Sequence, residues 1–461
     1  MNYWDDTNIY HTVANCILNG KVLYVDVHEQ KGLITFIMEL PGVIISRNSF
    51  FGLYLTEAAV FFFYSLFSLK IVSLFTRTDR IITTLIPVFA LTSFSSPYFR
   101  YGGCIEELLL PFTTYVLYLG LRTIKTDVMF TKKDALIIGF ICSWVFWTKI
   151  INCGIFLGFV IFVIVYAIMR KDSKKILPLA GFFLIGFLSL TIVVTAYFVV
   201  NGALSNLIDG YFLGNLQYAG RRSVAGVEDA ALIYLLVLNK DVTTEHLFFV
   251  FVYSGFSYLL IKKEKRCFLF SLLAFVFAVI GVYGAGYRMP YYIVALKFFC
   301  ALGWIPFFLL ISKVFSYFTS KGLSQFILSY FVFIASATLI ISSPAVYKLG
   351  TTKEDCPQYR FAAKINSIDD PKVLNYGFLD TGFFMAADVL PFNNHYCMIT
   401  IDDVYGYEQV SILNEGTADF IITNEPYSFE NYEMCDAGAY TNINFGGEEY
   451  TDTFYLYERA Q

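Results

Sequence analysis

Charged residues are scarce in this sequence: Asp, Glu, Lys and Arg make up 15% of the 461 residues, against about 25% in an ordinary soluble domain. Hydrophobic residues reach 57% and aromatic residues 19%. Stretches near the ~20 apolar residues needed to cross a bilayer recur through the first three quarters of the chain. This composition excludes a soluble cytosolic enzyme, a disordered tail, a disulfide-rich secreted scaffold and a nucleic-acid-binding protein.

Histidine and the common catalytic motifs are also lacking. The chain has four histidines, and its nine cysteines show no CxxC or other metal-ligand spacing. There is no GxGxxG, P-loop, GxSxG, HExxH or SxxK. We therefore predict no nucleotide site and no histidine-based active site, and we assign no metal ligands.

Acidic and basic residues are separated along the chain. Residues 344–461 contain 19 acidic and 6 basic side chains, whereas residues 1–343 contain 18 acidic and 27 basic ones. The boundary near Pro344 separates a membrane part from an acidic soluble part. We expect a first external loop with interfacial helices over 1–50, a multispanning domain over 51–343 and an extracytoplasmic α/β domain over 344–461.

Hydropathy predicts about ten membrane-spanning helices. A further apolar stretch at 30–46 is interrupted by Glu39, Pro41 and Arg47, so we interpret it as an interfacial helix, with a true span as the alternative. Some predicted spans are short and must tilt or extend into their flanks. The spans are 51–70, 81–96, 106–122, 134–148, 154–169, 176–200, 246–261, 267–283, 291–311 and 326–343.

Lys and Arg in the connections predict the orientation. One set of short loops holds 16 basic residues, and the opposite set holds 9 over a longer total length. We expect the first set in the cytoplasm of a bacterial cell. The N-terminal segment, the 201–245 loop and the acidic domain are then extracytoplasmic. Export of 1–50 requires a preceding helix, and we expect one to be missing before Met1.

Beyond Pro344, short β-prone runs alternate with helix-like stretches, which is typical of a small α/β layer. Acceptor binding or covering of the membrane site is the expected role, and a purely structural appendage is the alternative. The predicted strands are 372–377, 395–401, 418–424 and an edge strand at 453–457. The predicted helices are 356–368, 381–388 and 406–415.

Paired acids are the first candidate catalytic residues. Asp5 and Asp6 precede an apolar-periodic stretch, and a carboxylate in a partly dry interfacial site can act as a general base. Glu106 and Glu107 open a later predicted span, where they could position the acceptor, hold a divalent ion or orient the base. For both pairs the alternative is an acidic first helical turn, which the helix dipole favours.

Basic residues on the predicted outer face are candidate ligands for a phosphate. Lys149 lies at the outer end of a span, with snorkelling to the interface as the alternative. Arg288, beside Tyr287 at the mouth of a span, suits bidentate contact with phosphate. Arg221 and Arg222 are also candidate phosphate ligands, and the alternative is that they lie in a plain solvated loop. Lys297 lies inside a predicted span, where a charged residue is a functional candidate by default. The sequence does not identify its partner.

Four motifs carry a family resemblance. They are Trp4-Asp5-Asp6-x3-Tyr10 with the following 19–32, Tyr101–Glu107, Phe146–Lys149 and Leu374–Phe383. In this order they resemble the glycosyltransferase C (GT-C) superfamily. More narrowly, they resemble the polytopic group of protein O-mannosyltransferases and the aminoarabinose transferase of lipid A (glycosyltransferase family 39-like). Leu33 stands where bacterial members often have proline.

The resemblance implies a membrane glycosyltransferase that moves a sugar from a polyprenyl-phosphate donor to an extracytoplasmic acceptor hydroxyl, with inversion. It implies a general base at Asp5 or Asp6, and Tyr10 four residues later favours Asp6. Substrate-binding roles are expected for Tyr10, Asp26, Lys31 and Tyr287. The acceptor is a glycan, lipid or protein that the sequence does not specify.

Two other classes of protein remain as alternatives. One is a transporter or flippase of a lipid-linked sugar or small solute, and the other is a non-catalytic assembly protein of the cell envelope. A transporter would favour internal repeats and helices broken near the midplane of the bilayer. No clear repeat is visible, and the notable charges cluster on one predicted side, which favours one-sided chemistry.

Overall fold

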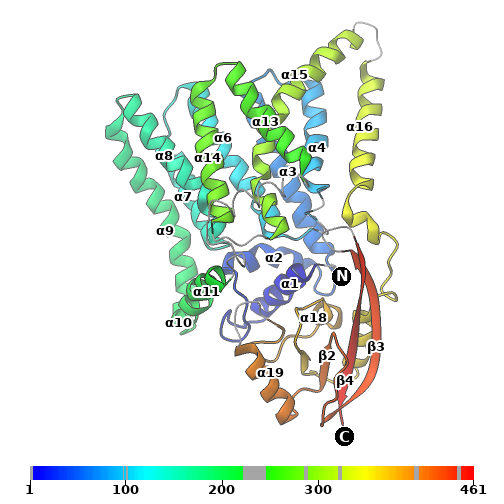
Figure 1. The fold of residues 1–461 in the computed structure, drawn as a ribbon. Helices are drawn as coiled ribbons and strands as arrows, with labels where there is room; N and C mark the ends of the chain where they lie inside the picture. Colours follow the sequence, from blue (N-terminus) through cyan, green and yellow to red (C-terminus); the bar gives the residue numbers. More distant parts are fainter. Residues whose placement is uncertain are drawn as a thin grey trace. The chain divides into compact units, whose positions relative to one another are not determined.

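The computed structural model describes residues 4–96, 98–99, 102–221, 245–284, 289–319, 324–398, 404–443 and 448–460 (Figure 1). The chain divides into two compact units. The sheet unit combines Met1–Thr56, Val194–Arg221 and Lys348–Gln461, and the helical unit combines Glu57–Val193 and Arg222–Tyr347.

Helices occupy all ten segments predicted as spans. The chain is mostly helical, and a small C-terminal sheet accompanies the long helices, as the predicted fold class requires. The elements are α3 (Phe51–Ser73), α4 (Arg80–Phe94), α5 (Ile105–Leu108), α6 (Leu110–Thr126), α7 (Lys132–Phe146), η1 (Ile150–Cys153), α8 (Gly154–Met169), η2 (Ser173–Lys175), α9 (Ile176–Val200), α13 (His246–Ile261), α14 (Lys265–Tyr283), η4 (Pro290–Phe299), α15 (Cys300–Thr319) and α16 (Ser324–Ile341).

Five stretches among the described residues are long and apolar enough to cross a membrane, judged by length and composition: Phe51–Ser73, Ile150–Met169, Ser173–Val200, Lys265–Tyr283 and Tyr291–Phe315. Shorter apolar helices cover Leu33–Ile45, Arg80–Phe94, His246–Ile261 and Phe326–Ile341. Helices of this length suit an interfacial position or a span in a locally thinned bilayer.

Glycines bring the backbones of neighbouring helices in the helical unit into contact. A Cβ atom on Gly139 of α7 would lie 2.0 Å from the carbonyl oxygen of Phe183 on α9, and one on Gly186 would lie 2.0 Å from that of Leu136. Small residues at such crossings allow close van der Waals packing where lipid gives little hydrophobic drive for association. Helices α7 and α9 are therefore a tightly fitted pair.

The sheet unit is assembled from three distant parts of the chain. Its helices are α1 (Asp5–Leu18), α2 (Leu33–Ile45), α10 (Leu204–Leu207), the π-helix η3 (Ile208–Leu213), α11 (Gly214–Arg221), α17 (Pro357–Ile365), α18 (Phe383–Ala387) and α19 (Val404–Glu415); the 3-10 turn η5 (Pro344–Lys348) leads into its last segment. Asn206 Nδ2 donates to the Tyr24 carbonyl at 3.3 Å, and Asn215 Nδ2 donates to the Gln30 carbonyl at 2.9 Å. These bonds attach α10 and α11 to the loop that follows α1.

The sheet has four strands in the order β1-β2-β4-β3. Strand β1 (Val373–Asn375) pairs in parallel with β2 (Phe420–Thr423). Strand β4 (Glu449–Arg459) pairs antiparallel with both β2 and β3 (Tyr432–Ile443) (Figure 1). The strand predictions at 372–377 and 418–424 and the three helix predictions in this segment are confirmed.

Two strand predictions need correction. The edge strand predicted at 453–457 belongs to β4, which lies inside the sheet because an unpredicted strand, β3, covers its other side. The strand predicted at 395–401 is absent over its described residues, 395–398. There the Tyr396 carbonyl accepts from Asn375 N, and Met398 N donates to the Phe378 carbonyl. These bonds hold the segment beside β1 without forming a regular ladder.

Candidate functional site

The N-terminal acid pair begins α1. Asp5 and Asp6 are half-buried in its first helical turn, where the exposed N–H groups and the helix dipole favour negative charge. Tyr10, one turn later and 2% exposed, donates from its hydroxyl to Asp6 Oδ2 at 3.4 Å. The side-chain geometry thus singles out Asp6 as the acid that contacts the predicted tyrosine.

Lys31 lies beside the same tyrosine. Its ammonium is 5.8 Å from the centre of the Tyr10 ring and 3.2 Å from Glu29 Oε1. Glu29 also accepts from the Lys31 backbone N–H, and the Tyr24 hydroxyl donates to the Lys31 carbonyl. The acid cluster, defined as Asp6, Tyr10, Glu29 and Lys31, therefore joins three predicted residues with one carboxylate to which the sequence assigned no role.

A buried carboxylate anchors the helix that carries this cluster. Asp380, fully buried, accepts from the Thr12 hydroxyl at 2.6 Å and from the Gly382 N–H at 2.8 Å. Burial raises the pKa of Asp380 from its ordinary 3.8 to about 6, against the lowering effect of these hydrogen bonds. Gly382 has a φ of 95°, and a Cβ atom there would lie 2.9 Å from Asn8 Oδ1. The Leu374–Phe383 motif thus fixes α1 in place.

Other predicted residues of the sheet unit lie apart from the acid cluster. Asp26 is exposed and accepts from the Val22 N–H at 2.7 Å, so it closes the turn over 22–26. Arg221 is the last residue of α11, and its side chain lies outside the description. Arg222, Tyr287 and Arg288 also lie outside the described residues, so their predicted roles stay predictions.

In the helical unit, the predicted Glu106 and Lys149 form an ion pair. The Lys149 ammonium lies 2.5 Å from Glu106 Oε1, and both residues are buried, at 9% and 1% exposure. The same ammonium lies over the rings of Tyr292 and Tyr291, at 4.4 and 5.3 Å from their centres. Lys149 therefore does not extend its charge to the interface by snorkelling. Its ammonium instead contacts a carboxylate and two aromatic faces within the helical unit.

Glu107 lies in a backbone turn next to this pair. Gly102 and Gly103 both adopt positive φ, at 82° and 77°, immediately before α5. The Gly103 N–H donates to Glu107 Oε2 at 3.2 Å and also to Glu57 on α3. A Cβ atom on Gly102 would lie 2.3 Å from Glu57 Oε1. The two glycines therefore permit a turn that brings Glu57 and Glu107 to the same N–H.

A second ion pair in the helical unit assigns a partner to Lys297. Its ammonium lies 3.2 Å from Glu245 Oε2 and 3.2 Å from the Ser93 carbonyl. Glu245 also accepts from the Ser96 hydroxyl, and the Tyr64 hydroxyl donates to the Lys297 carbonyl at 2.9 Å. Lys297 and both tyrosines of the first pair lie on η4, so one short 3-10 helix contributes to both ion pairs.

Sequence reasoning missed Glu57 and Glu245, and it included Asp380 in the Leu374–Phe383 motif without assigning it a role. A signal existed for Glu57, since an acid inside an otherwise apolar predicted span is a functional candidate by default. No local spacing connects Glu245 with Lys297 or Asp380 with Thr12, so neither contact was visible. Within the described ranges, no group of three or more His, Cys, Asp or Glu side chains is arranged to hold a metal ion. The divalent ion considered for Glu106 and Glu107 stays a prediction.

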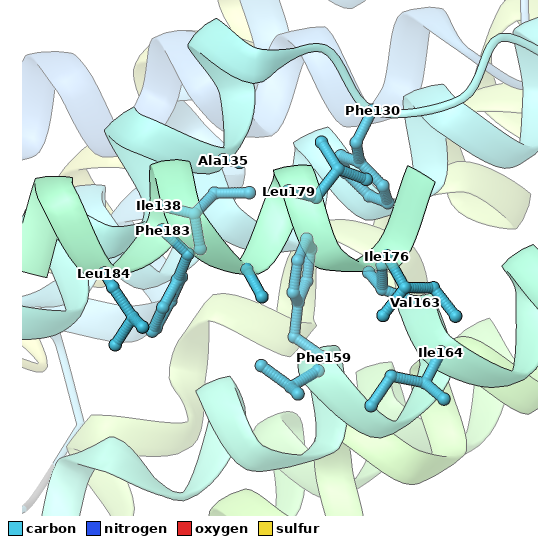
Figure 2. Close-up of a pocket in the computed structure, with 12 residues that line it drawn as sticks. Phe130, Ala135, Ile138, Phe159, Val163, Ile164, Ile176, Leu179, Phe183 and Leu184 are labelled. Carbon is cyan, nitrogen blue, oxygen red and sulfur yellow. The ribbon is translucent and has the colours of Figure 1, made fainter. Parts of the chain in front are cut away.

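An apolar cavity of about 270 Å³ lies among α7, α8 and α9 (Figure 2). Its labelled side chains come from all three helices and from Phe130 just before α7, and they converge on the space between the ribbons. The lining is aliphatic and aromatic: Phe130, Ala135, Ile138, Phe159, Val160, Val163, Ile164, Ile176, Leu179, Ala180, Phe183 and Leu184. Such a cavity suits a hydrocarbon chain and offers nothing to a polar ligand.

The architecture defines the class by its fold: it is a polytopic, GT-C-like fold, as the motif resemblance predicted. Solved structures that share this fold include two of ArnT, an aminoarabinose transferase, from Cupriavidus metallidurans. One is bound to undecaprenyl phosphate, with a TM-score of 0.58 and 10% identity. The other is in the apo state, with a TM-score of 0.55 and 11% identity. Each comparison covers 98% of this chain and 93% of the ArnT chain.

At this identity the likeness establishes the fold. No protein-family profile matches the sequence, and no curated protein matches it.

Proposed function

We propose that this chain is a membrane glycosyltransferase that transfers a sugar from a polyprenyl-phosphate donor to an extracytoplasmic acceptor hydroxyl. The observation that carries the proposal is the fold shared with ArnT over 98% of the chain, because one ArnT structure is bound to undecaprenyl phosphate. Nucleotide sugars are made in the cytoplasm, so an outward-facing site requires a donor that reaches it through the bilayer.

The acid cluster supplies the proposed base. The acceptor hydroxyl attacks the anomeric carbon, the bond from that carbon to the phosphate oxygen breaks, and the polyprenyl phosphate leaves. Asp6, or Asp5 beside it, takes the hydroxyl proton. A single displacement of this kind inverts the anomeric centre. The Tyr10 hydroxyl and Lys31 ammonium orient the carboxylate and its surroundings.

Lys149 is the proposed contact for the donor phosphate. Its ammonium is held between Glu106 and the tyrosine rings, so its position is set before any ligand arrives. A fixed cation near a departing phosphate stabilises the negative charge that develops on it. The apolar cavity of Figure 2 is lined by side chains that suit a stretch of the isoprenoid tail.

The test uses purified full-length protein in liposomes with a panel of undecaprenyl-phosphate sugars and an envelope acceptor fraction. We expect one donor to be consumed by the wild type and not by the Asp5→Asn/Asp6→Asn double variant, because an amide cannot accept the proton. Folding of the variant is checked by its thermal midpoint. Equal consumption by both proteins would refute the catalytic assignment. Movement of the intact donor between leaflets without consumption would indicate a flippase.

A further inference from the structure

A polar pocket opens at the far end of α1 from the acid pair. Its volume is about 430 Å³, within the 300–1,000 Å³ range of small-ligand sites. The lining comes from the end of α1, Arg47 shortly after α2, the segment following α17, and the end of α18 with the residues after it, all within the sheet unit. The lining residues that carry polar side chains are Asn15, Asn19, Arg47, Asn366, Asp369, Asp370 and Asp388.

Asn15 makes this pocket more than a surface depression. It is 6% exposed, and its Oδ1 accepts from Asn19 Nδ2 at 3.0 Å. Among the residues that the structure describes, its Nδ2 group has no hydrogen-bond partner, although the side chain lines the pocket. The Nδ2 atom is accessible from the pocket rather than sealed in the interior, so water or a ligand in the pocket completes its hydrogen bonds. The floor of the pocket therefore presents a donor to whatever enters it.

The rim is rich in acceptors. Asp369, Asp370 and Asp388 are exposed carboxylates, and none of them forms an ion pair within the described ranges. The one cation of the lining, Arg47, donates to Asn19 Oδ1 at 2.9 Å. Three carboxylates against one guanidinium give the pocket a negative balance. Phosphate-bearing and carboxylate-bearing ligands are disfavoured there, and hydroxyl or ammonium donors are favoured.

We propose that this pocket is a binding subsite for the acceptor, and that the acceptor is an uncharged or amine-bearing oligosaccharide. That the ligand is an acceptor rests on the proposed function. The chemical class of the ligand rests on the pocket alone. Carboxylates, amides and a guanidinium form paired hydrogen bonds with neighbouring sugar hydroxyls. Ile368, Val389 and Leu390 add apolar surface for the face of a sugar ring.

Distance along α1 indicates the size of this acceptor. Asp6 and Asn15 are separated by nine residues of one helix, or ~14 Å at ~1.5 Å per residue. A single sugar cannot fill the pocket and also present its hydroxyl to Asp6. The acceptor therefore extends over several sugar units, one held in the pocket and another near the base.

The test measures binding to the full-length protein in detergent, without donor. The probes have four sugar units each: chitotetraose (neutral), its fully de-N-acetylated form (cationic) and tetragalacturonate (anionic). We expect the first two to bind, the cationic form more tightly at low salt, and tetragalacturonate not to bind. No binding of either of the first two at millimolar concentration, or equal binding of all three, would overturn the inference.

Two variants test the pocket itself. Asn15→Leu removes the amide donor at the floor of the pocket, and Asp369→Asn/Asp388→Asn removes two carboxylates; Asn tolerates the positive φ of 54° at position 388. We expect each variant to weaken binding of the cationic tetramer by about tenfold or more. Glu430→Gln, an exposed acid of the same unit outside the pocket, serves as the matched control and keeps wild-type binding. Unchanged affinity in the folded Asp369→Asn/Asp388→Asn protein contradicts the proposal.

The outcome for the pocket is separable from that for the transferase. Asp5→Asn/Asp6→Asn lies outside the lining, so it keeps oligosaccharide binding even though it loses transfer. Pocket-dependent binding without transfer from any donor supports the subsite and counts against the transferase. Transfer with an acceptor KM unchanged in both pocket variants supports the transferase and overturns the subsite. Transfer with a raised acceptor KM and an unchanged kcat supports both.

Discussion

Lys297 and Glu245 form an ion pair inside the helical unit, with 3.2 Å between Nζ and Oε2 and side-chain exposures of 1% and 5%. Neither residue has a sequence neighbour that suggests the other. Moving two such charges out of water is expensive, and their mutual attraction offsets that only when the pair is intact. The Ser93 carbonyl and the Ser96 hydroxyl complete the hydrogen bonding around the pair.

Breaking this pair should destabilise the protein strongly. Lys297→Met leaves Glu245 buried without its cation, and we expect a loss of about 3–5 kcal/mol in unfolding free energy. Lys297→Met/Glu245→Leu should recover most of it, since no charge then stays buried. Thermal unfolding in detergent measures both variants. The Lys125–Glu264 pair, 25% and 30% exposed, is the control, and Lys125→Met there should cost under ~1 kcal/mol. Equal losses at the two lysines would contradict the assigned burial.

The single-acid variants should separate Asp6 from Asp5. Asp6→Asn is expected to lower kcat about 10²- to 10⁴-fold, the usual contribution of a general base. Asp5→Asn should keep most of the activity, since the Tyr10 hydroxyl contacts Asp6. Rates of transfer at saturating donor and acceptor are the measurement. A larger loss in Asp5→Asn would transfer the role of base to that residue, with Tyr10 serving Asp6 structurally.

Lys149 and Glu106 can be tested for separate contributions to folding and to donor binding. Lys149→Met and Glu106→Gln each leave one buried partner unpaired, so both should lower the thermal midpoint. The double variant should regain stability. If Lys149 contacts the donor phosphate, the double variant still binds donor about tenfold or more weakly, because the cation is gone. Wild-type donor affinity in a folded double variant would make the pair purely structural.

The raised pKa of Asp380 predicts that the stability of the protein depends on pH. Burial raises its pKa to about 6 in the folded protein, above the unfolded value near 3.8. The folded state then binds the Asp380 proton more tightly than the unfolded state does. The contribution of Asp380 to stability is therefore greatest below about pH 4. It falls as the pH rises to about 6, by an amount on the order of 3 kcal/mol.

Asp380→Asn should remove this slope. The amide keeps an oxygen for the Gly382 N–H, and its Nδ2 can donate to the Thr12 hydroxyl oxygen, so the fold is retained. Thermal midpoints of wild type and variant between pH 4 and 7 give the comparison. Asp452, a half-buried acid of the same unit, is left intact in both proteins. A wild-type slope that survives in the variant would assign the dependence to another group.

Periodicity and hydropathy predicted the helices because a span is encoded locally, in the length and apolarity of one segment. Strand β3 escaped prediction for the opposite reason. Its sequence, Tyr432–Ile443, contains small and polar residues with little strand propensity. It forms because β4 offers a partner along its whole length, and cross-strand pairing outweighs propensity.

The same contrast applies to the candidate site. Asp6 and Tyr10 are one helical turn apart, so their contact follows from the spacing alone. Lys149 was predicted as a cation at the membrane boundary, but its contact with Glu106 depends on how the turn between α7 and η1 packs against α5. The contact of Thr12 with Asp380 joins the first and last parts of the chain. Contacts of that kind leave no periodic trace in a sequence.

The scattered origin of the sheet unit has a consequence for biosynthesis. The helix that carries Asp6 emerges from the ribosome before the described apolar helices α3–α16, whereas its anchor Asp380 emerges after them. Until then α1 lacks the carboxylate that accepts from Thr12. A nascent chain can therefore insert its spans into the bilayer while the proposed base is still unpositioned. The proposed base is therefore positioned by completion of the last segment rather than by membrane insertion.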